Sequence, residues 1–394
     1  MRSGATLLRS KGAEMSGGPL SGNRFRRRAE PRSRGSAPDG VTGACGIPPR
    51  PSPLEFLGQD QVPPIACGRS EGNEMKAIVQ DRYGSPDVLE LREIEKPAIE
   101  EAGVLVRVRA ASVNALDWHV TRGVPFLVRM TEGLRRPKIP VRGVDVAGTV
   151  EAVGTKVTQF QPGDEVFGMR SAAFAEYVCG KEKSFVPKPA GLTFEQAAAV
   201  PVAAETALQG LRDKGQIRPG QKVLINGASG GVGTFAVQIA KAFGADVTGV
   251  CSPRNVDMIQ SIGAERVIDY SREDFTRDEQ RYDLIFDVAG NHSPSDCRRA
   301  LNPNGTLVLA GQSGRKKPTI LPFLTAPVVS RFVRHRLVTF VTKHSKEDLL
   351  ALNELMETGK VTPVVDRLYP LREAPEAIRY LGEGHPRAKV VITM

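Results

Sequence analysis

The sequence predicts an α/β protein whose second half forms a doubly wound parallel sheet and whose first half is built mostly from short strands. Between residues 202 and 341, short apolar segments alternate with helical patterns, as in a parallel sheet with crossover helices. Residues 222–241 combine an apolar segment, a glycine-rich turn and a helical pattern, the context in which a glycine motif indicates a nucleotide site. From residue 75 to about residue 201, short strand-like segments and turns dominate instead.

Composition and charge narrow the class of protein. The 394 residues are 40% hydrophobic and 25% charged, as in a globular protein of about two to three domains. Of the net charge of +10, residues 1–74 contribute +4 (11 Lys/Arg, 7 Asp/Glu) and the rest +6 (43 against 37). This mild excess forms no basic stripe, so no nucleic-acid partner is expected, and a cleft for a phosphate-bearing cofactor suffices to explain it. The five cysteines lie far apart and form neither a zinc motif nor a disulfide framework, which favours a reducing, intracellular compartment. No apolar run approaches the roughly 20 residues of a membrane span.

Residues 1–74 are rich in Gly, Pro, Ser and Arg and show no sustained hydrophobic period. Such a segment cannot bury enough apolar surface to offset the entropy of ordering it. Three interpretations stay open: a disordered tail, sequence upstream of a true start at Met75, or an organelle-targeting segment. The Arg and Ser content favours targeting, whereas Glu14 and Glu30 count against it. We expect a cytoplasmic protein, with mitochondrial targeting as the alternative.

The individual elements follow from local patterns. In the first half, strands are expected at 75–79, 104–108, 144–150, 174–178 and within 160–168, and Thr193 is the expected cap of a helix that continues through residue 200. The six strands of the parallel sheet are expected at 223–226, 246–251, 266–269, 284–288, 306–310 and 337–341. The remaining elements are a helix at 346–358, an extended segment at 361–365, a helix near 374–381 and a final strand at 388–393.

The glycine turn departs from the G-x-G-x-x-G spacing, because the first glycine position falls on Ala228 while Gly230 and Gly233 fit the second and third. An ordinary glycine-rich loop is the alternative interpretation. The flanking strand and helix favour a dinucleotide site, because the turn lets a pyrophosphate approach and the helix N-terminus offers N–H groups to it. The predicted cofactor-binding residues of the turn are Ser229, Gly230, Gly231, Val232 and Gly233.

The end of the next strand indicates which nicotinamide cofactor binds. NAD sites usually place an acidic residue about 20 residues after the first glycine, to bond the ribose hydroxyl. Here the strand ends at Cys251 and is followed by Ser252 and Arg254, with no acid. Arg254 can receive a 2′-phosphate and Ser252 can hydrogen-bond it, so NADP is favoured over NAD. A solvated surface arginine is the alternative for Arg254.

Five sequence motifs occur together between Met75 and Met394. They are FQPGDEVFG at 160–168, FAEYV at 174–178, GASGGVG at 227–233, GAERVIDY at 263–270 and RAKVVI at 387–392. With these motifs the chain resembles the medium-chain dehydrogenase/reductases, specifically their zinc-free quinone-oxidoreductase branch, which includes zeta-crystallin-like proteins. A mitochondrial, reticulon-interacting branch shares the same motifs. The resemblance implies a GroES-like, mostly-β catalytic domain around a Rossmann nucleotide-binding domain, and a homodimer. The expected limits are an N-terminal extension at 1–74, the catalytic domain at 75–201, the Rossmann domain at 202–341 and a C-terminal return to the catalytic domain at 342–394.

The resemblance also implies further cofactor residues. Tyr270 matches a tyrosine near the adenosine phosphate, with core packing at a strand end as the alternative. Asp287 and Val288 match the strand end that flanks the cofactor, and Gly311 matches the next strand end, near the nicotinamide. Lys389 matches a basic position near the cofactor, with an exposed strand lysine as the alternative.

The same resemblance bears on metal and catalysis. Zinc-dependent relatives have a cysteine at the position of Asn114 and Gly-His-Glu at 143–145, so no metal site is expected. Asn114 is the candidate residue for a hydrogen bond to the substrate oxygen or to a cofactor hydroxyl, with a turn-forming role as the alternative. Asp117 follows it closely, and Thr206 matches a residue near the nicotinamide. No side chain is a compelling general acid, so solvent is an expected proton source.

The expected function is NADPH-dependent hydride transfer to a small quinone or α,β-unsaturated carbonyl. An NAD(P)-dependent alcohol dehydrogenase and a non-catalytic NADPH-binding partner protein are the alternatives. Substrate choice is expected to lie in residues 119–141 and 312–335, and the basic segment 135–138 is expected to be a solvated turn.

Overall fold

The computed structural model describes residues 73–310, 334–384 and 386–394. The predicted extension 1–74 lies outside this range except for residues 73 and 74, and Gly311 lies outside it as well. The domain limits expected from the sequence stay predictions. None of the helices in the described part of the chain is long and apolar enough to cross a membrane.

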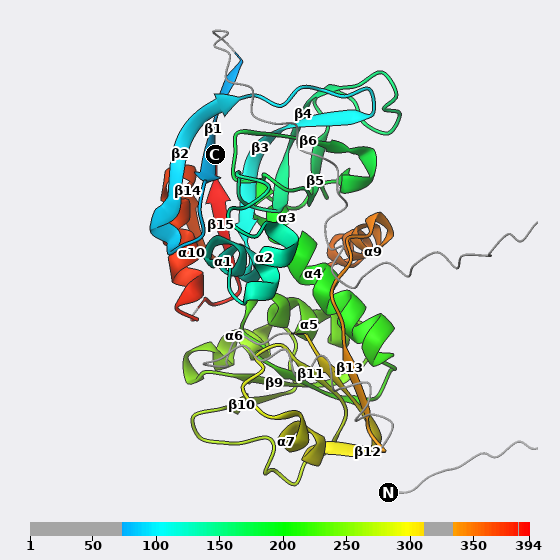
Figure 1. Ribbon diagram of the computed structural model, residues 1–394. Coiled ribbons are helices and arrows are strands. Elements are labelled where there is room, and N and C mark those ends of the chain that lie inside the picture. Colours follow the sequence, from blue (N-terminus) through cyan, green and yellow to red (C-terminus); the bar gives the residue numbers. More distant parts are fainter. Residues whose placement is uncertain (1–72, 311–333, 385) are drawn as a thin grey trace, which may run out of the picture. The chain divides into compact units, whose positions relative to one another are not determined.

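The second half forms a six-stranded parallel sheet with the strand order β10-β9-β8-β11-β12-β13 within the described residues (Figure 1). The predicted doubly wound sheet is thus confirmed, because the order reverses next to β8, the strand that leads into the glycine turn. The strands are β8 (Lys222–Asn226), β9 (Asp246–Cys251), β10 (Arg266–Asp269), β11 (Tyr282–Asp287), β12 (Leu301–Leu309) and β13 (Arg336–Thr339).

Both faces of this sheet are buried, which explains why its strands are short apolar runs without alternation. Val223 and Ile225 point to one face and pack in the cluster that contains the helices α4 and α5. Leu224 points to the other face and packs with Cys297 of α7. The helices of this half are α4 (Pro201–Leu208), continued by a π-helical turn (Gln209–Gly215), α5 (Gly231–Ala242), α6 (Val256–Ser261) and α7 (Pro294–Arg299).

The first half forms a mainly antiparallel sheet with the order β14-β15-β3-β4-β5-β7, to which β6 adds by pairing with β3. A separate two-stranded ribbon pairs β1 (Glu74–Gln80) with β2 (Leu89–Glu95). The strands of the larger sheet are β3 (Gly103–Val113), β4 (Asp145–Val153), β5 (Glu165–Met169), β6 (Tyr177–Lys181), β7 (Phe185–Pro187), β14 (Val365–Pro370) and β15 (Lys389–Thr393).

Two helices in the first half were not predicted: α1 (Ala115–Arg122) and α2 (Phe126–Glu132). The signal for α1 was present, because Asn114 precedes the helix and Asp117 accepts the Asn114 backbone N–H at 2.8 Å. The predicted cap at Thr193 is confirmed, since its hydroxyl accepts the Gln196 N–H at 3.2 Å. That helix, α3 (Phe194–Ala198), is shorter than expected, and α4 follows it directly.

One predicted strand was placed wrongly. Within residues 174–178, only Tyr177 and Val178 belong to a strand, β6. The preceding Phe174 carbonyl and Glu176 N–H form hydrogen bonds with the backbone of β1, but without a regular ladder. In the segment expected to be extended at 361–365, strand β14 begins only at Val365. There the backbone of Thr362 is bonded on both sides by the Gln238 side chain of α5, at 2.8 and 3.0 Å.

The chain end returns to the first sheet and thereby assembles the site. After α9 (Lys346–Glu357) and α10 (Ala374–Gly382), strand β15 inserts between β14 and β3. Its register places Val390 opposite Val113, the last residue of β3. Lys389, the first residue of β15, is therefore brought next to Asn114, which directly follows β3, although the two are far apart in sequence.

Candidate active site and cofactor site

The glycine turn lies at the carboxyl edge of the parallel sheet. Gly227 has a φ of +86°, and its N–H donates to the Val250 carbonyl of the neighbouring strand at 3.2 Å. A Cβ on Gly233 would lie 2.1 Å from the Gly227 carbonyl oxygen, so only glycine fits this helix-to-strand approach. A Cβ on Gly230 would meet nothing closer than 3.5 Å, which leaves space beside the N-terminus of α5. The residues from Ser229 to Gly233 therefore form a cradle that suits a pyrophosphate.

The residues proposed for the 2′-phosphate gather at the same edge. Ser252 and Arg254 follow the end of β9, and Tyr270 follows the end of β10. The Tyr270 N–H donates to the Cys251 carbonyl at 3.2 Å, so these two strand ends are adjacent. Tyr270 is 56% exposed, and the alternative that it packs in the core is wrong. The Ser252 hydroxyl accepts a bond from Asn255 at 3.1 Å and so is held in place.

Asp287 and Val288 also lie at this edge, at the end of β11. The Asp287 carboxylate accepts hydrogen bonds from the Asn226 amide and the Gly290 N–H, both at 2.8 Å. The Val288 N–H donates to the Asn226 carbonyl at 3.0 Å. These bonds tie the end of β11 to the strand that leads into the glycine turn, so the Asp287 carboxylate orders the edge of the site.

A cluster of buried polar side chains forms where β3 ends and β15 passes. Asp145 is fully buried, and its Oδ2 accepts hydrogen bonds from the Ser112 hydroxyl at 2.8 Å and the Asn114 amide at 2.9 Å. The Lys389 ammonium donates to Asn114 Oδ1 at 2.7 Å and lies 3.3 Å from Asp145 Oδ2. Asp145 Oδ1 accepts the Val202 N–H from the first turn of α4 at 3.0 Å. Every polar atom of the Asn114 side chain thus has a partner inside the protein.

Lys389 connects this cluster to the glycine turn. It is only 2% exposed, so the alternative of an exposed strand lysine is wrong. A Cβ on Gly231 would lie 2.9 Å from Lys389 Cδ, which places the lysine stem against the first residue of α5. The preceding Ala388 N–H donates to the Ser229 carbonyl at 2.8 Å. Burial lowers the pKa of Lys389, and the facing Asp145 carboxylate acts in the opposite direction.

Asp117 lies one turn into α1, with its Oδ2 bonded to the Asn114 backbone N–H at 2.8 Å. Burial raises the pKa of Asp117 to about 7, although that bond and the charges of Arg142 and Lys389 lower it. A cavity of about 30 Å³ lies beside it, with Arg142 and Ser171 among its walls. This volume accommodates roughly one water molecule. Asp117 is thus a buried carboxyl that exchanges a proton near neutral pH, which the sequence pattern did not indicate.

Thr206 lies on α4 with its hydroxyl bonded to two partners. It donates to the Val202 carbonyl at 2.6 Å and lies 2.7 Å from the Thr342 hydroxyl. The neighbouring Glu205 is fully buried and faces His344 Nδ1 at 3.1 Å. Burial lowers the pKa of His344 and the Glu205 carboxylate raises it, and the net direction is upward. The sequence analysis missed this pair, because the sequence does not show which distant residue the glutamate of an alanine-rich helix contacts after folding.

Asp145 was also missed as a site residue, because the sequence argument treated 143–145 only as the place where zinc ligands are absent. The available signal was an acid inside the apolar run of β4, since a buried carboxylate needs a partner. Lys389, in the apolar run of β15, carries the complementary signal. Arg142 is a third buried charge of this region, only 5% exposed, and burial lowers its pKa.

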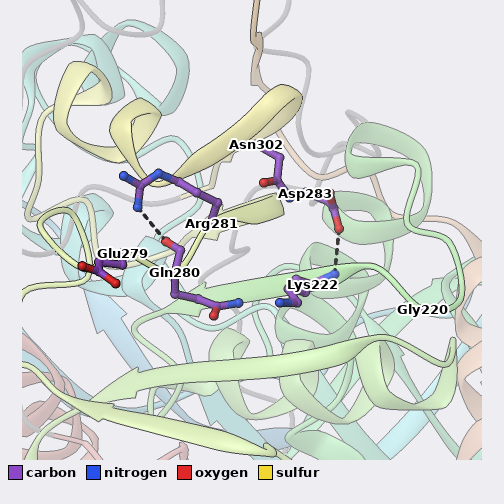
Figure 2. Close-up of a pocket in the computed structure, with 7 residues that line it drawn as sticks. All are labelled: Gly220, Lys222, Glu279, Gln280, Arg281, Asp283 and Asn302. Carbon is purple, nitrogen blue, oxygen red and sulfur yellow. Dashed lines mark hydrogen bonds between the residues drawn. The ribbon is translucent and has the colours of Figure 1, made fainter.

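A larger cavity than the one beside Asp117 lies elsewhere. It has a volume of about 440 Å³, and Figure 2 shows its walls, Lys222, Asp283 and Asn302 among them. Lys222 opens β8 and Asp283 lies at the start of β11, so this cavity is at the amino edge of the parallel sheet. Dinucleotides bind at the carboxyl edge of such sheets, and the cavity is therefore not the cofactor site.

At the positions where zinc-dependent relatives have their metal ligands, the residues of this chain do not suit a zinc ion. A catalytic zinc needs about three ligands from Cys, His or acidic side chains. At the position in question stand Asn114, Val144 and Asp145, and the Lys389 ammonium bonds the two polar ones. Within the ranges that the structure describes, no group of three or more such side chains could hold a metal ion. A cation would have to displace the lysine and would find a single carboxylate.

Comparison with known families gives two matches. A model described as an alcohol dehydrogenase GroES-like domain matches residues 100–190. A model described as a zinc-binding dehydrogenase matches residues 262–392. The first covers the antiparallel sheet around Asp145, and the second covers the later parallel strands and the return to β15. The GroES-like and Rossmann-type architecture expected from the sequence is thereby confirmed.

Named relatives cover most of the chain. It is 33% identical to an NADPH-dependent alkenal/one oxidoreductase, chloroplastic, of Arabidopsis thaliana, over 83% of this chain and 82% of that protein. It is 33% identical to a mitochondrial NAD(P)H oxidoreductase of Mus musculus, over 84% of this chain and 92% of that protein. Among solved structures, a quinone oxidoreductase from Coxiella burnetii is 31% identical, with a TM-score of 0.72 over 82% of this chain and 99% of that one.

Proposed function

The chain belongs to the quinone-oxidoreductase branch of the medium-chain dehydrogenase/reductase superfamily, and on this premise we propose that it is an NADPH-dependent reductase of quinones or α,β-unsaturated carbonyls. The observation that carries the proposal is the continuous contact from the glycine turn through Lys389 to Asn114. It would join the proposed dinucleotide cradle to a buried polar cluster, and among the described residues no group of three or more Cys, His or acidic side chains could hold a metal ion.

NADPH rather than NADH is the proposed donor. The cradle from Ser229 to Gly233 suits a pyrophosphate, and no acid stands at the end of β9 to bond a ribose 2′-hydroxyl. Ser252, Arg254 and the exposed Tyr270 lie at the adjacent strand ends and offer a hydroxyl, a guanidinium and a phenol to a 2′-phosphate. We further propose that Val288 flanks the cofactor and that Gly311 lies near the nicotinamide, as the resemblance implies, with Asp287 ordering the strand end.

The bound dihydronicotinamide supplies a hydride, and the reaction needs one proton in addition. An enone takes the hydride at its electron-poor β-carbon and the proton at the α-carbon; a quinone takes both to form a hydroquinone. We propose Asp117 as the proton donor, working through the small cavity beside it. Its pKa of about 7 keeps part of the carboxyl protonated at neutral pH.

We propose that Asn114, Asp145 and Lys389 act as positioning residues. Because their hydrogen bonds are made to one another, they hold the end of β3, the start of α4 and strand β15 in a fixed relation. Thr206, on the same helix α4, is proposed to lie beside the nicotinamide, with its hydroxyl oriented by Thr342.

Turnover assays test the proposal. The purified full-length chain is given NADPH or NADH and a panel of simple quinones and enones, and loss of the dihydronicotinamide absorbance is followed. We expect oxidation that depends on both the acceptor and the protein. Tight NADPH binding with no turnover across the panel would instead indicate a binding protein. Rapid oxidation of ethanol or benzyl alcohol with NADP⁺, without enone reduction, would indicate an alcohol dehydrogenase.

Arg254→Glu tests the cofactor preference separately. If Arg254 pairs with a 2′-phosphate, the reversed charge should raise the KM for NADPH at least tenfold and leave that for NADH nearly unchanged. A charge-assisted bond of roughly 1.5–3 kcal/mol corresponds to such a factor. Arg277→Glu is the matched control, because Arg277 is an exposed arginine of a loop after β10. Equal effects on both cofactors would remove Arg254 from the phosphate site.

We propose a cytoplasmic homodimer, with a mitochondrial location as the alternative that one relative's name supports. Light scattering of the purified chain measures its mass in solution, and a monomer would contradict the dimer. Fractionation of cells that express the full chain with a C-terminal tag separates the two compartments.

A further inference from the structure

An exposed apolar surface lies on helix α2 and its flanks. Phe126, Met130 and Leu134 are 64%, 61% and 63% exposed, and Val124 is 40% exposed. Phe126 and Met130 are four residues apart and share one face of the helix. A large apolar side chain has a surface of roughly 150–250 Å². Combined with the exposed fractions, this gives an exposed apolar surface on the order of 400 Å² for the four residues together. We call these four residues the α2 patch.

The α2 patch is part of an anchored segment. The Arg129 guanidinium stacks on the Tyr83 ring at 4.7 Å, and Arg129 Nε donates to the Gly123 carbonyl at 3.0 Å. The Tyr83 hydroxyl donates to the Gly133 carbonyl at 2.6 Å. The two ends of α2 are therefore fixed to the catalytic domain, while the apolar side chains of Phe126 and Met130 face outward. A fixed helix that is apolar on its outward face calls for a partner.

A basic segment follows directly. Arg135, Arg136 and Lys138 are exposed, and none of them makes an ion pair with another residue of the described ranges. The acid nearest in sequence, Glu132, is half-buried in the wall of the small cavity. The outward charge beside the α2 patch is thus positive. A solvated turn, as expected from the sequence, would not explain why the basic segment lies next to exposed apolar side chains.

We propose that the α2 patch and its basic segment dock on the surface of an anionic lipid bilayer. Aromatic and aliphatic side chains flanked by Lys and Arg are the composition of helices that lie in a membrane interface. An anionic surface complements the unpaired charges, and each basic side chain near it adds attraction. The surface is too small for a stable protein partner, since each side of such an interface buries about 800 Å². A bilayer needs no complementary shape, and two turns of exposed side chains suffice to enter it.

The position of the α2 patch gives this docking a consequence for the site. Glu132 and Ile139, at the end of α2 and shortly after it, line the small cavity together with Asp117. The segment that carries the α2 patch therefore adjoins the cavity beside Asp117. This arrangement would present the proposed site to acceptors dissolved in the bilayer, although the docking itself does not rest on the proposed reaction.

Vesicle co-sedimentation of the full chain tests the proposal. The vesicles are phosphatidylcholine alone or phosphatidylcholine with about a quarter of phosphatidylglycerol, at low and high salt. We expect binding to the anionic vesicles that falls with salt, and little binding to phosphatidylcholine alone. No binding to anionic vesicles, or equal binding to both compositions, would overturn the proposal.

Three double variants assign the surface. Phe126→Ser with Met130→Ser should lower vesicle binding at least tenfold, and Arg135→Ala with Arg136→Ala should lower it roughly fivefold for each charge removed. Leu350→Ser with Leu368→Ser is the control, because these exposed apolar residues lie on α9 and β14. Thermal melting checks that each variant folds.

Two outcomes would refute the assignment to the α2 patch. One is a control variant that loses as much vesicle binding as the patch variants. The other is a patch variant that keeps its vesicle binding but turns a dimer into a monomer in light scattering, which would make this face a contact between two copies of the chain.

Discussion

Asp117→Asn is the substitution whose effect the structure defines most closely. The amide is nearly the size of the carboxyl, and its Oδ1 can still accept the Asn114 N–H that Asp117 accepts at 2.8 Å. The substitution therefore keeps the cap of α1 and removes only a titrating group. Asp117 is only 4% exposed, and the charges of Asp145, Arg142 and Lys389 act on its carboxyl.

The magnitude follows from the pKa difference between the folded and unfolded chain. The pKa of Asp117 rises from 3.8 to about 7, mainly through burial. A raised folded pKa stabilises the protein fully below the unfolded pKa and loses that contribution as the pH rises through the folded one. One pKa unit corresponds to about 1.36 kcal/mol of unfolding free energy, so the full pKa difference corresponds to about 4 kcal/mol. About 3 kcal/mol of this stability is lost between about pH 5 and about pH 9.

Urea denaturation of both proteins at about pH 5 and about pH 9 measures this contribution. The free energy of unfolding of the wild type should fall by about 3 kcal/mol relative to Asp117→Asn across that interval. Asp257→Asn, at an exposed acid of α6, should follow the wild type at both pH values. A wild type and an Asp117→Asn variant that change in parallel would refute the buried, near-neutral carboxyl and its role as proton donor.

The remaining predictions concern the buried pair and the glycine turn. Lys389→Met leaves the Asp145 carboxylate buried without its cation and should lower the free energy of unfolding, measured by urea denaturation, by about 3–5 kcal/mol. Adding Asp145→Asn should restore part of this free energy. A decrease no larger than that caused by replacing a surface lysine would contradict the buried network. Gly233→Ala places a Cβ 2.1 Å from a backbone oxygen and should abolish nucleotide binding and destabilise the fold by roughly 1–3 kcal/mol. Gly191→Ala, where a Cβ meets nothing within 4 Å, should leave both nearly unchanged, and similar losses in the two variants would argue against the tight turn.

The parallel sheet could be predicted because its signals are local. Val223, Leu224 and Ile225 form an uninterrupted apolar run that leads into a glycine turn, and burial on both faces of the sheet is the reason for such a run. The Thr193 cap is likewise a short-range pattern of hydroxyl and amide. The helices α1 and α2 were missed because they are short, and one pair of apolar residues four positions apart does not make a sustained helical period.

The partners in the buried cluster could not be predicted, because they are distant in sequence. Lys389 and Asp145 are 244 residues apart and meet only after β15 returns to β3. The sequence showed each as an isolated charge in an apolar run, which predicts a partner without identifying it. The pKa of Asp117 is still less accessible, since it depends on how completely α1 and its neighbours enclose one carboxyl.

Deuterium transfer tests the central claim most directly. The chain is treated with a chelator, given NADPH that carries deuterium at the transferable position of its dihydronicotinamide ring, and mixed with a simple enone. The account predicts a saturated product labelled at the β-carbon, formed at the same rate as before chelation. A rate that collapses on chelation, or a product without deuterium, would contradict a metal-free hydride transfer from NADPH.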